Sequence, residues 1–70
     1  MWTMVVSKYH KNLIQIFEFE QKPNIDAMLK TGCGRVLSFY HMRHMCHHDE
    51  FCSKNGDMTI TLEKEENDAV

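Results

Sequence analysis

The dipeptide Asn55-Gly56 is the strongest local folding signal in this chain of 70 residues. Asn-Gly between two β-prone segments is typical of a two-residue type I′ hairpin turn, because both residue types tolerate positive φ angles. With these residues as the loop, Phe51 lies opposite Ile60, and Lys54 lies opposite Asp57. An apolar pair and an opposite-charge pair both support this register. The sequence therefore predicts a C-terminal hairpin whose second strand turns its alternate apolar side chains toward a core.

A second hairpin is predicted over residues 2–20. Residues 2–9 alternate, with the apolar side chains of Trp2, Met4 and Val6 on one side. Residues 13–20 are rich in isoleucine and phenylalanine, and glutamates are interleaved among them. The polar break His10-Lys11-Asn12 separates the two segments, and asparagine tolerates the left-handed conformation that a short turn needs.

A short helix is predicted between the hairpins. Asn24 is a suitable N-cap, Asp26 complements the helix dipole in the first turn, and Gly32 supplies the C-terminal stop. Ile25 and Met28 begin an apolar stripe at helical spacing. We expect this helix to have about two turns.

Residues 35–48 support two interpretations. A strand is favoured by a run of β-prone side chains and by the lack of a clear N-cap after Gly34; the run is Val36, Leu37, Phe39 and Tyr40. A helix is the alternative, because it would align His41, His44 and His48 on one face. We take the strand as the prediction for this segment.

The predicted order is β-β-α-β-β, which describes a small two-layer α+β domain with a four-stranded antiparallel sheet and one short helix. We assign residues 1–62 to this domain and residues 63–70 to an acidic C-terminal tail with a net charge of −3. A core of this size is thin. A homodimer through a sheet edge, or through the uncovered sheet face, would enlarge it.

The composition indicates a cytoplasmic protein. An apolar content of 43% is typical of a folded chain, and the apolar runs are too short to span a membrane. The N-terminus lacks the basic and apolar regions of a signal peptide. Three cysteines are too few for a disulfide scaffold, and an odd number cannot all pair within one chain, so we expect reduced thiols.

Residues 40–52 hold four of the five histidines and two of the three cysteines. Imidazole and thiolate are good ligands for zinc, and the candidate set is His44, Cys46, His48 and Cys52. The spacing, however, lacks the Cys-x2–4-Cys knuckle of familiar zinc modules. We therefore expect no cofactor, and a zinc-binding regulatory domain that contacts nucleic acid is the alternative.

Catalysis is not expected from this sequence. Cys33, between two glycines, looks exposed but follows a helix C-terminus, whose dipole disfavours a thiolate. Cys46 has histidine neighbours, yet a chain this short leaves little room for a substrate pocket.

Nucleic-acid binding through Arg35, Arg43 and the adjacent aromatics is not favoured, because nucleic-acid-binding domains are usually much more basic.

Protein binding is the function that we predict. Trp2, Tyr40 and Arg43 belong to the residue types that dominate binding energy at protein interfaces. Six methionines add adaptable side chains of a kind common at recognition surfaces, although we expect Met28 and Met58 to fill the core. The composition is similar in style to small accessory proteins of phages and prophages, many of which inhibit or redirect a host protein. The expected partner is a larger cytosolic protein, and the three residues are the candidate contacts.

Overall fold

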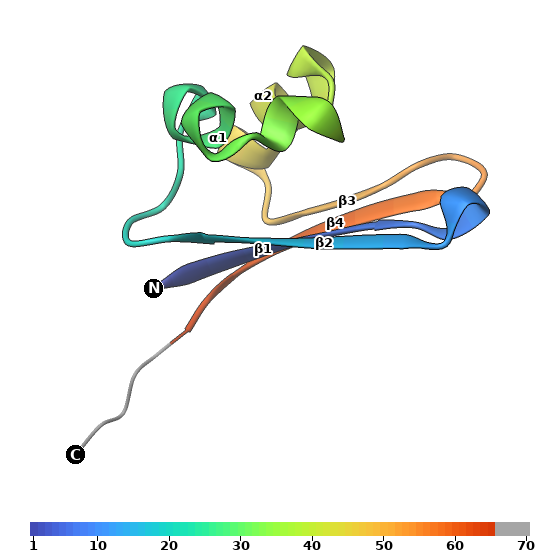
Figure 1. Ribbon diagram of the computed structural model, residues 1–70, viewed down its shortest axis with the longest axis horizontal. Helices are drawn as coiled ribbons and strands as arrows, with labels where there is room; N and C mark the ends of the chain where they lie inside the picture. The colour runs from blue at the N-terminus through green and yellow to red at the C-terminus, as the bar shows by residue number, and fades with distance from the viewer. Residues whose placement is uncertain (66–70) are drawn as a thin grey trace.

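Residues 1–65, the part of the chain that the computed structural model describes, form a four-stranded antiparallel sheet covered on one face by two helices (Figure 1). The strands lie in the order β2-β1-β4-β3. Their bounds are β1 Trp2–Lys8, β2 Leu13–Phe19, β3 Glu50–Cys52 and β4 Met58–Lys64. The helices are α1 Ile25–Thr31 and α2 Phe39–His47, with 3-10 turns η1 at Tyr9–Lys11 and η2 at Cys33–Arg35.

The N-terminal hairpin and the first helix are confirmed. β1 pairs with β2 along its whole length, and Asn12 adopts the predicted left-handed conformation in the turn, with a φ of 53°. The Asn24 side chain caps α1 by accepting the Ala27 N–H at 2.8 Å. Gly32 ends α1 with a φ of 93°, a conformation that glycine adopts without the strain other residues would meet.

The strand predicted over residues 35–48 is wrong, and the helical alternative is correct. Ser38 is the N-cap of α2: its Oγ accepts the His41 N–H at 3.4 Å, while its own N–H donates to His41 Nδ1 at 3.1 Å. This reciprocal arrangement is a capping box, which usually has Glu or Gln where this chain has His41. The fold therefore has the order β-β-α-α-β-β, and the prediction of one helix is corrected to two within residues 1–65.

The core lies between the helices and the sheet. Its buried members come from both layers, and they are Met4, Val6, Phe19, Met28, Cys33, Leu37, Met42, Met45, Met58, Ile60 and Leu62. Every methionine except Met1 is buried there. Met28 and Met58 are therefore core residues as predicted, whereas Met4, Met42 and Met45 also fill the interior and do not form a recognition surface.

The C-terminal hairpin is confirmed in register but not in turn type. Phe51 pairs with Ile60 as predicted. Asn55 does not have the positive φ that a type I′ turn requires, whereas Gly56 does, at 75°. The loop is wider than two residues: the Ser53 N–H donates to the Met58 carbonyl at 2.9 Å, and inside the loop the Asn55 Oδ1 accepts the backbone N–H of Asp57 at 3.2 Å.

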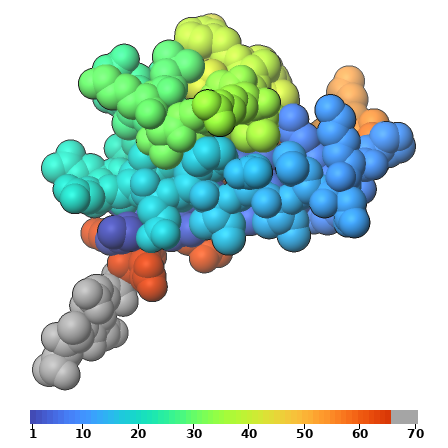
Figure 2. All heavy atoms as spheres, viewed as in Figure 1, coloured from blue at the N-terminus to red at the C-terminus, as the bar shows by residue number. Residues whose placement is uncertain are grey.

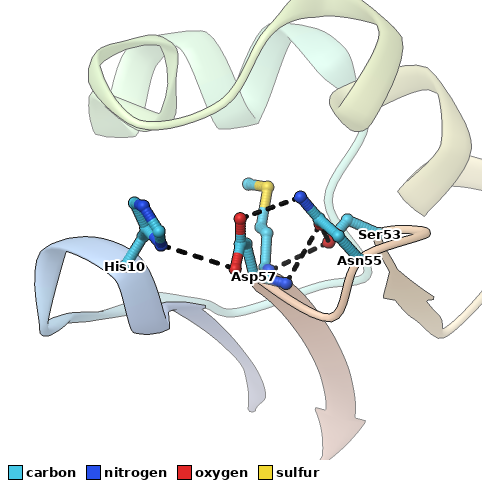
Figure 3. A network of polar contacts seen from close by, with 5 residues as sticks. His10, Ser53, Asn55 and Asp57 are labelled. Carbon is cyan, nitrogen blue, oxygen red and sulfur yellow. Dashed lines mark hydrogen bonds and ion pairs between the residues drawn. The ribbon is translucent and has the colours of Figure 1, made fainter.

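Asp57 joins the two hairpin turns rather than pairing with Lys54 as predicted. One carboxylate oxygen accepts from Asn55 Nδ2 at 2.8 Å, and the other lies 3.6 Å from His10 Nδ1 (Figure 3). The Asp57 carbonyl also accepts the Tyr9 N–H at 2.8 Å. Both turns extend beyond the helical layer at one end of the molecule (Figure 2).

The sheet continues into the predicted tail. β4 ends at Lys64, which pairs with Trp2, so Glu63 and Lys64 belong to the domain and not to a separate tail. Residues 66–70, the remainder of the predicted tail, lie outside the described residues.

Within residues 1–65, neither helix has the length and apolar character needed to cross a membrane.

Candidate functional site

The outward side of α2 carries the most unusual surface of the described chain. The helix buries Met42 and Met45 against the sheet, so the residues between them on the helix project into solvent. Tyr40, Arg43 and His44 lie at helical spacing on that outer side. The rings of Phe39 and Tyr40 are 58% and 66% exposed, which is a large apolar area for a chain of this size to leave uncovered.

Phe51 of β3 holds the rings beside α2 in a fixed arrangement. The centroid of its ring lies 5.0 Å from that of His41, 5.1 Å from that of His44 and 6.2 Å from that of Tyr40. All three contacts are edge-to-face, the geometry that aromatic quadrupoles prefer. His44 Nε2 also lies 3.2 Å from the Glu50 carbonyl oxygen, and its ring stacks on His48 at 4.6 Å. The first turn of α2 and its histidines are therefore positioned by packing.

A shallow hollow of about 450 Å³ lies on the outer side of α2. We call its lining the α2 face, and its residues are Phe39, Tyr40, Arg43, His44, His47 and His48. A second hollow begins at Tyr40 and His44 and continues along β3 to Phe51 and Cys52. The two hollows share Tyr40 and His44, so an extended segment of another molecule could follow both.

The α2 face combines aromatic rings with basic side chains. No acid occurs in the sequence between Asp26 and Asp49, a stretch that includes all of α2. Among residues 1–65, the ion pairs involve His10, Lys22 and Lys30, none of which belongs to the α2 face. Arg43 therefore has its charge available to a partner.

The structure brings together two of the three predicted contact residues. Tyr40 and Arg43 both line the hollow on the α2 face. Trp2 does not: it lies on β1, half-buried against the core, with Lys22 Nζ 5.7 Å from its ring centroid. The basic residues considered for nucleic acid are also separated, because Arg35 lines a different hollow beside β2.

The four proposed zinc ligands do not converge. His44 and His48 stack on each other one helical turn apart, but Cys46 is half-buried and packs against the core. Cys52 is exposed on β3, where it pairs with Thr59. Within residues 1–65, no three His, Cys, Asp or Glu side chains are grouped closely enough to hold a metal ion. The cause is the helix itself, which turns residues 44 and 46 to different sides.

A strong chelator is therefore expected to leave the folded state unchanged. A structural zinc contributes directly to the free energy of folding, so removing one would unfold a small domain. The core of this chain is closed by apolar side chains instead. Thermal unfolding followed by circular dichroism, with and without EDTA, checks this prediction. A melting temperature that falls by several degrees in EDTA would contradict it.

Cys33 is not the exposed thiol that its glycine neighbours indicated. The side chain is fully buried in the core cluster, and burial raises the pKa of its thiol to about 11. A thiol of this pKa stays protonated at neutral pH, and the thiolate is the nucleophilic form. Cys33 is therefore a small apolar core residue.

Phe51, His41 and Ser38 are the residues of this region that the sequence analysis did not assign to it. Ser38, three residues before His41 and just before the apolar positions Met42 and Met45, was the signal that indicates the start of a helix.

Comparisons of the chain with protein-family models, with curated proteins and with solved structures found no match.

Proposed function

We propose that this chain is a non-enzymatic binding module that regulates or inhibits a larger protein by occupying its surface with the α2 face. The observation that carries the proposal is the pair of exposed rings, Phe39 and Tyr40, beside Arg43, whose charge makes no ion pair with any of residues 1–65. Aromatic and arginine side chains gathered at one site are the usual centre of a protein interface. Binding is the means of action, because occupying a surface needs no catalytic group.

The chemistry of the α2 face indicates the kind of segment that it binds. Its rings offer apolar area, which contributes roughly 25 cal/mol for each Å² removed from water. Arg43 can bind a carboxylate through two parallel hydrogen bonds, and the neighbouring imidazoles add donors. An acidic segment with one or two large apolar side chains would complement this surface. The fixed ring positions reduce the entropy lost on binding.

Replacing Tyr40 or Arg43 by alanine is expected to weaken binding while leaving the fold intact. Truncation of an interface hot spot costs about 2 kcal/mol or more, which is roughly a 30-fold loss of affinity. A cross-linker installed beside the α2 face would identify the partner in cell extract, and titration calorimetry would then compare the variants. Tyr9→Ala and Lys11→Ala are matched controls, because both residues are exposed and lie away from the α2 face.

Two outcomes would contradict the proposal. Equal affinities for Tyr40→Ala and Tyr9→Ala would mean that the partner binds elsewhere. Unfolding of Tyr40→Ala would mean that the contact of this ring with Phe51 is structural. Tyr40→Phe separates the second case, because it keeps the ring contact and removes only the hydroxyl.

A further inference from the structure

The sheet has two edges that are protected very differently. β3 forms one edge, but it is only three residues long and carries the exposed Glu50. β2 forms the other edge with seven residues, Leu13–Phe19, that contain no lysine, no proline and no break in their pairing with β1, and their single charged side chain, Glu18, lies next to the strand's end. Natural proteins usually interrupt a free edge with one of these devices, because an unprotected edge accepts another strand. Figure 2 shows β2 as an uncovered light-blue band below the helices.

The hydrogen bonds at the ends of β1 show which backbone groups of β2 are free. The Tyr9 N–H donates to Asp57, and the Met1 carbonyl accepts from Glu65, so odd-numbered residues along β1 face β4. Hydrogen bonding alternates along an antiparallel strand, and the even-numbered residues of β1 therefore face β2. Their partners in β2 are odd-numbered. The backbone groups of Ile14, Ile16 and Glu18 consequently point away from the sheet.

Two of these residues, Ile14 and Ile16, leave an apolar patch at this edge. They alternate along β2 with Phe17 and Phe19, which pack against the core, so they project from the sheet face that carries no helix, and they are 68% and 60% exposed. Val5 of β1 lies beside Ile16 on that face. On the helical side, a hollow of about 390 Å³ lined by Gln15 and Phe17 leaves room next to the edge. Both faces of the edge can therefore accept side chains from an added strand.

We infer that the occupant of this edge is the β2 strand of a second copy, which pairs antiparallel to form a continuous eight-stranded sheet. A two-fold axis normal to the sheet keeps each face on its own side. One register matches the side chains best, with Gln15 of the two copies meeting on the axis. Ile14 then lies opposite Ile16 of the second copy, and each such pair exchanges both backbone hydrogen bonds.

The ends of the paired strands are complementary in this register. Leu13 lies opposite Phe17 of the second copy, and Glu18 lies opposite Asn12, next to the basic Lys11. Like charges do not face each other along β2 in this register, and apolar cross-strand pairs stabilise a sheet. A shift by two residues would place Ile14 opposite Glu18 in one direction, or Ile16 opposite Asn12 in the other, and would lose these matches. The α2 face contacts β3 at the opposite edge, so the dimer would present two copies of it.

Sedimentation equilibrium of the full chain tests the inference directly. We expect a species of twice the 8.3 kDa chain mass. Ile16→Lys should return it to the monomer, because it places two charges beside isoleucines of the other copy. Ile16→Pro should do the same, because it removes an outward N–H that has no place in the ladder between β2 and β1. Thr61→Lys is the matched control, since it changes an exposed residue on the same face but far from the edge.

A cross-linking experiment tests the register itself. In a Cys52→Ser background, Gln15→Cys should form an intermolecular disulfide rapidly on mild oxidation, because residues that face each other across the axis have Cα atoms about 4.5 Å apart. Glu18→Cys, which is equally exposed on the same strand, should not. A monomeric wild type at all concentrations, or a dimer disrupted by Thr61→Lys but not by Ile16→Pro, would overturn the inference. Equal cross-linking of the two cysteine variants would also overturn it.

Discussion

Met45→Ala is expected to destabilise this domain by about 2–5 kcal/mol, enough to leave much of the chain unfolded. The Met45 side chain is fully buried where α2 packs on the sheet. Removing its thioether arm leaves a cavity that a core of so few residues cannot refill. A single core of this size supplies only about 3–5 kcal/mol of net stability, so the loss is comparable to the whole. Urea unfolding followed by circular dichroism gives the difference in free energy.

Two further variants show whether the effect comes from packing. Met45→Leu conserves volume and should cost less than about 1.5 kcal/mol. His47→Ala lies on the exposed side of the same helix and should change stability by no more than about 0.5 kcal/mol. A cost for Met45→Ala that matches the cost for His47→Ala would mean that α2 does not pack on the sheet as described.

The predictable part of the fold is the part in which local signals agree. In the C-terminal hairpin the alternation and the cross-strand partner of Phe51 indicate the register that the structure has. In the N-terminal hairpin the alternation and the polar break indicate the two strands and the turn between them, and both strands are present. The caps of α1 were likewise explicit at Asn24 and Gly32. Each of these signals depends only on neighbours in the sequence, so no tertiary contact was needed to read it.

Helix α2 was missed because local preference and tertiary packing disagree there. The side chains of Val36, Leu37 and the following aromatics favour a strand. A helix, however, buries both Met42 and Met45 in the core, and this burial outweighs the local preference. The capping box that marks the start of α2 was also hard to recognise in the sequence, because His41 replaces the Glu or Gln of a usual capping box. The error carried over to the site: a helix puts Tyr40, Arg43 and His44 on one face, whereas a strand would have divided them.

The stability of the domain is expected to fall as the pH drops below about 6.5, and His41 is one identifiable cause. Burial lowers the pKa of this imidazole from its ordinary value, and the positive charges of Lys8 and of protonated His44 lower it further. Its Nδ1 accepts the Ser38 N–H at 3.1 Å, so the neutral ring carries its proton on Nε2. A proton on Nδ1 would remove the acceptor and break the capping box of α2.

The direction of the effect follows from proton linkage. Because the folded-state pKa of His41 lies below the unfolded-state value of about 6.5, the unfolded chain binds the proton first as the pH falls. The contribution of His41 is therefore fully present above that value and is lost as the pH falls toward the folded-state pKa. A capping interaction contributes about 0.5–2 kcal/mol, which sets the scale of the loss.

His41→Gln is the variant that isolates this effect, because glutamine at the same position can complete the capping box and does not titrate. The free energy of unfolding of the wild type should fall more between about pH 7 and pH 5 than that of His41→Gln. An NMR titration should place the pKa of His41 below the ordinary histidine value of about 6.5. Identical pH profiles for the two proteins would contradict the prediction.

Since α2 begins with Phe39 and Tyr40, fraying of its first turn at low pH would also release the two rings on which the proposed binding surface depends.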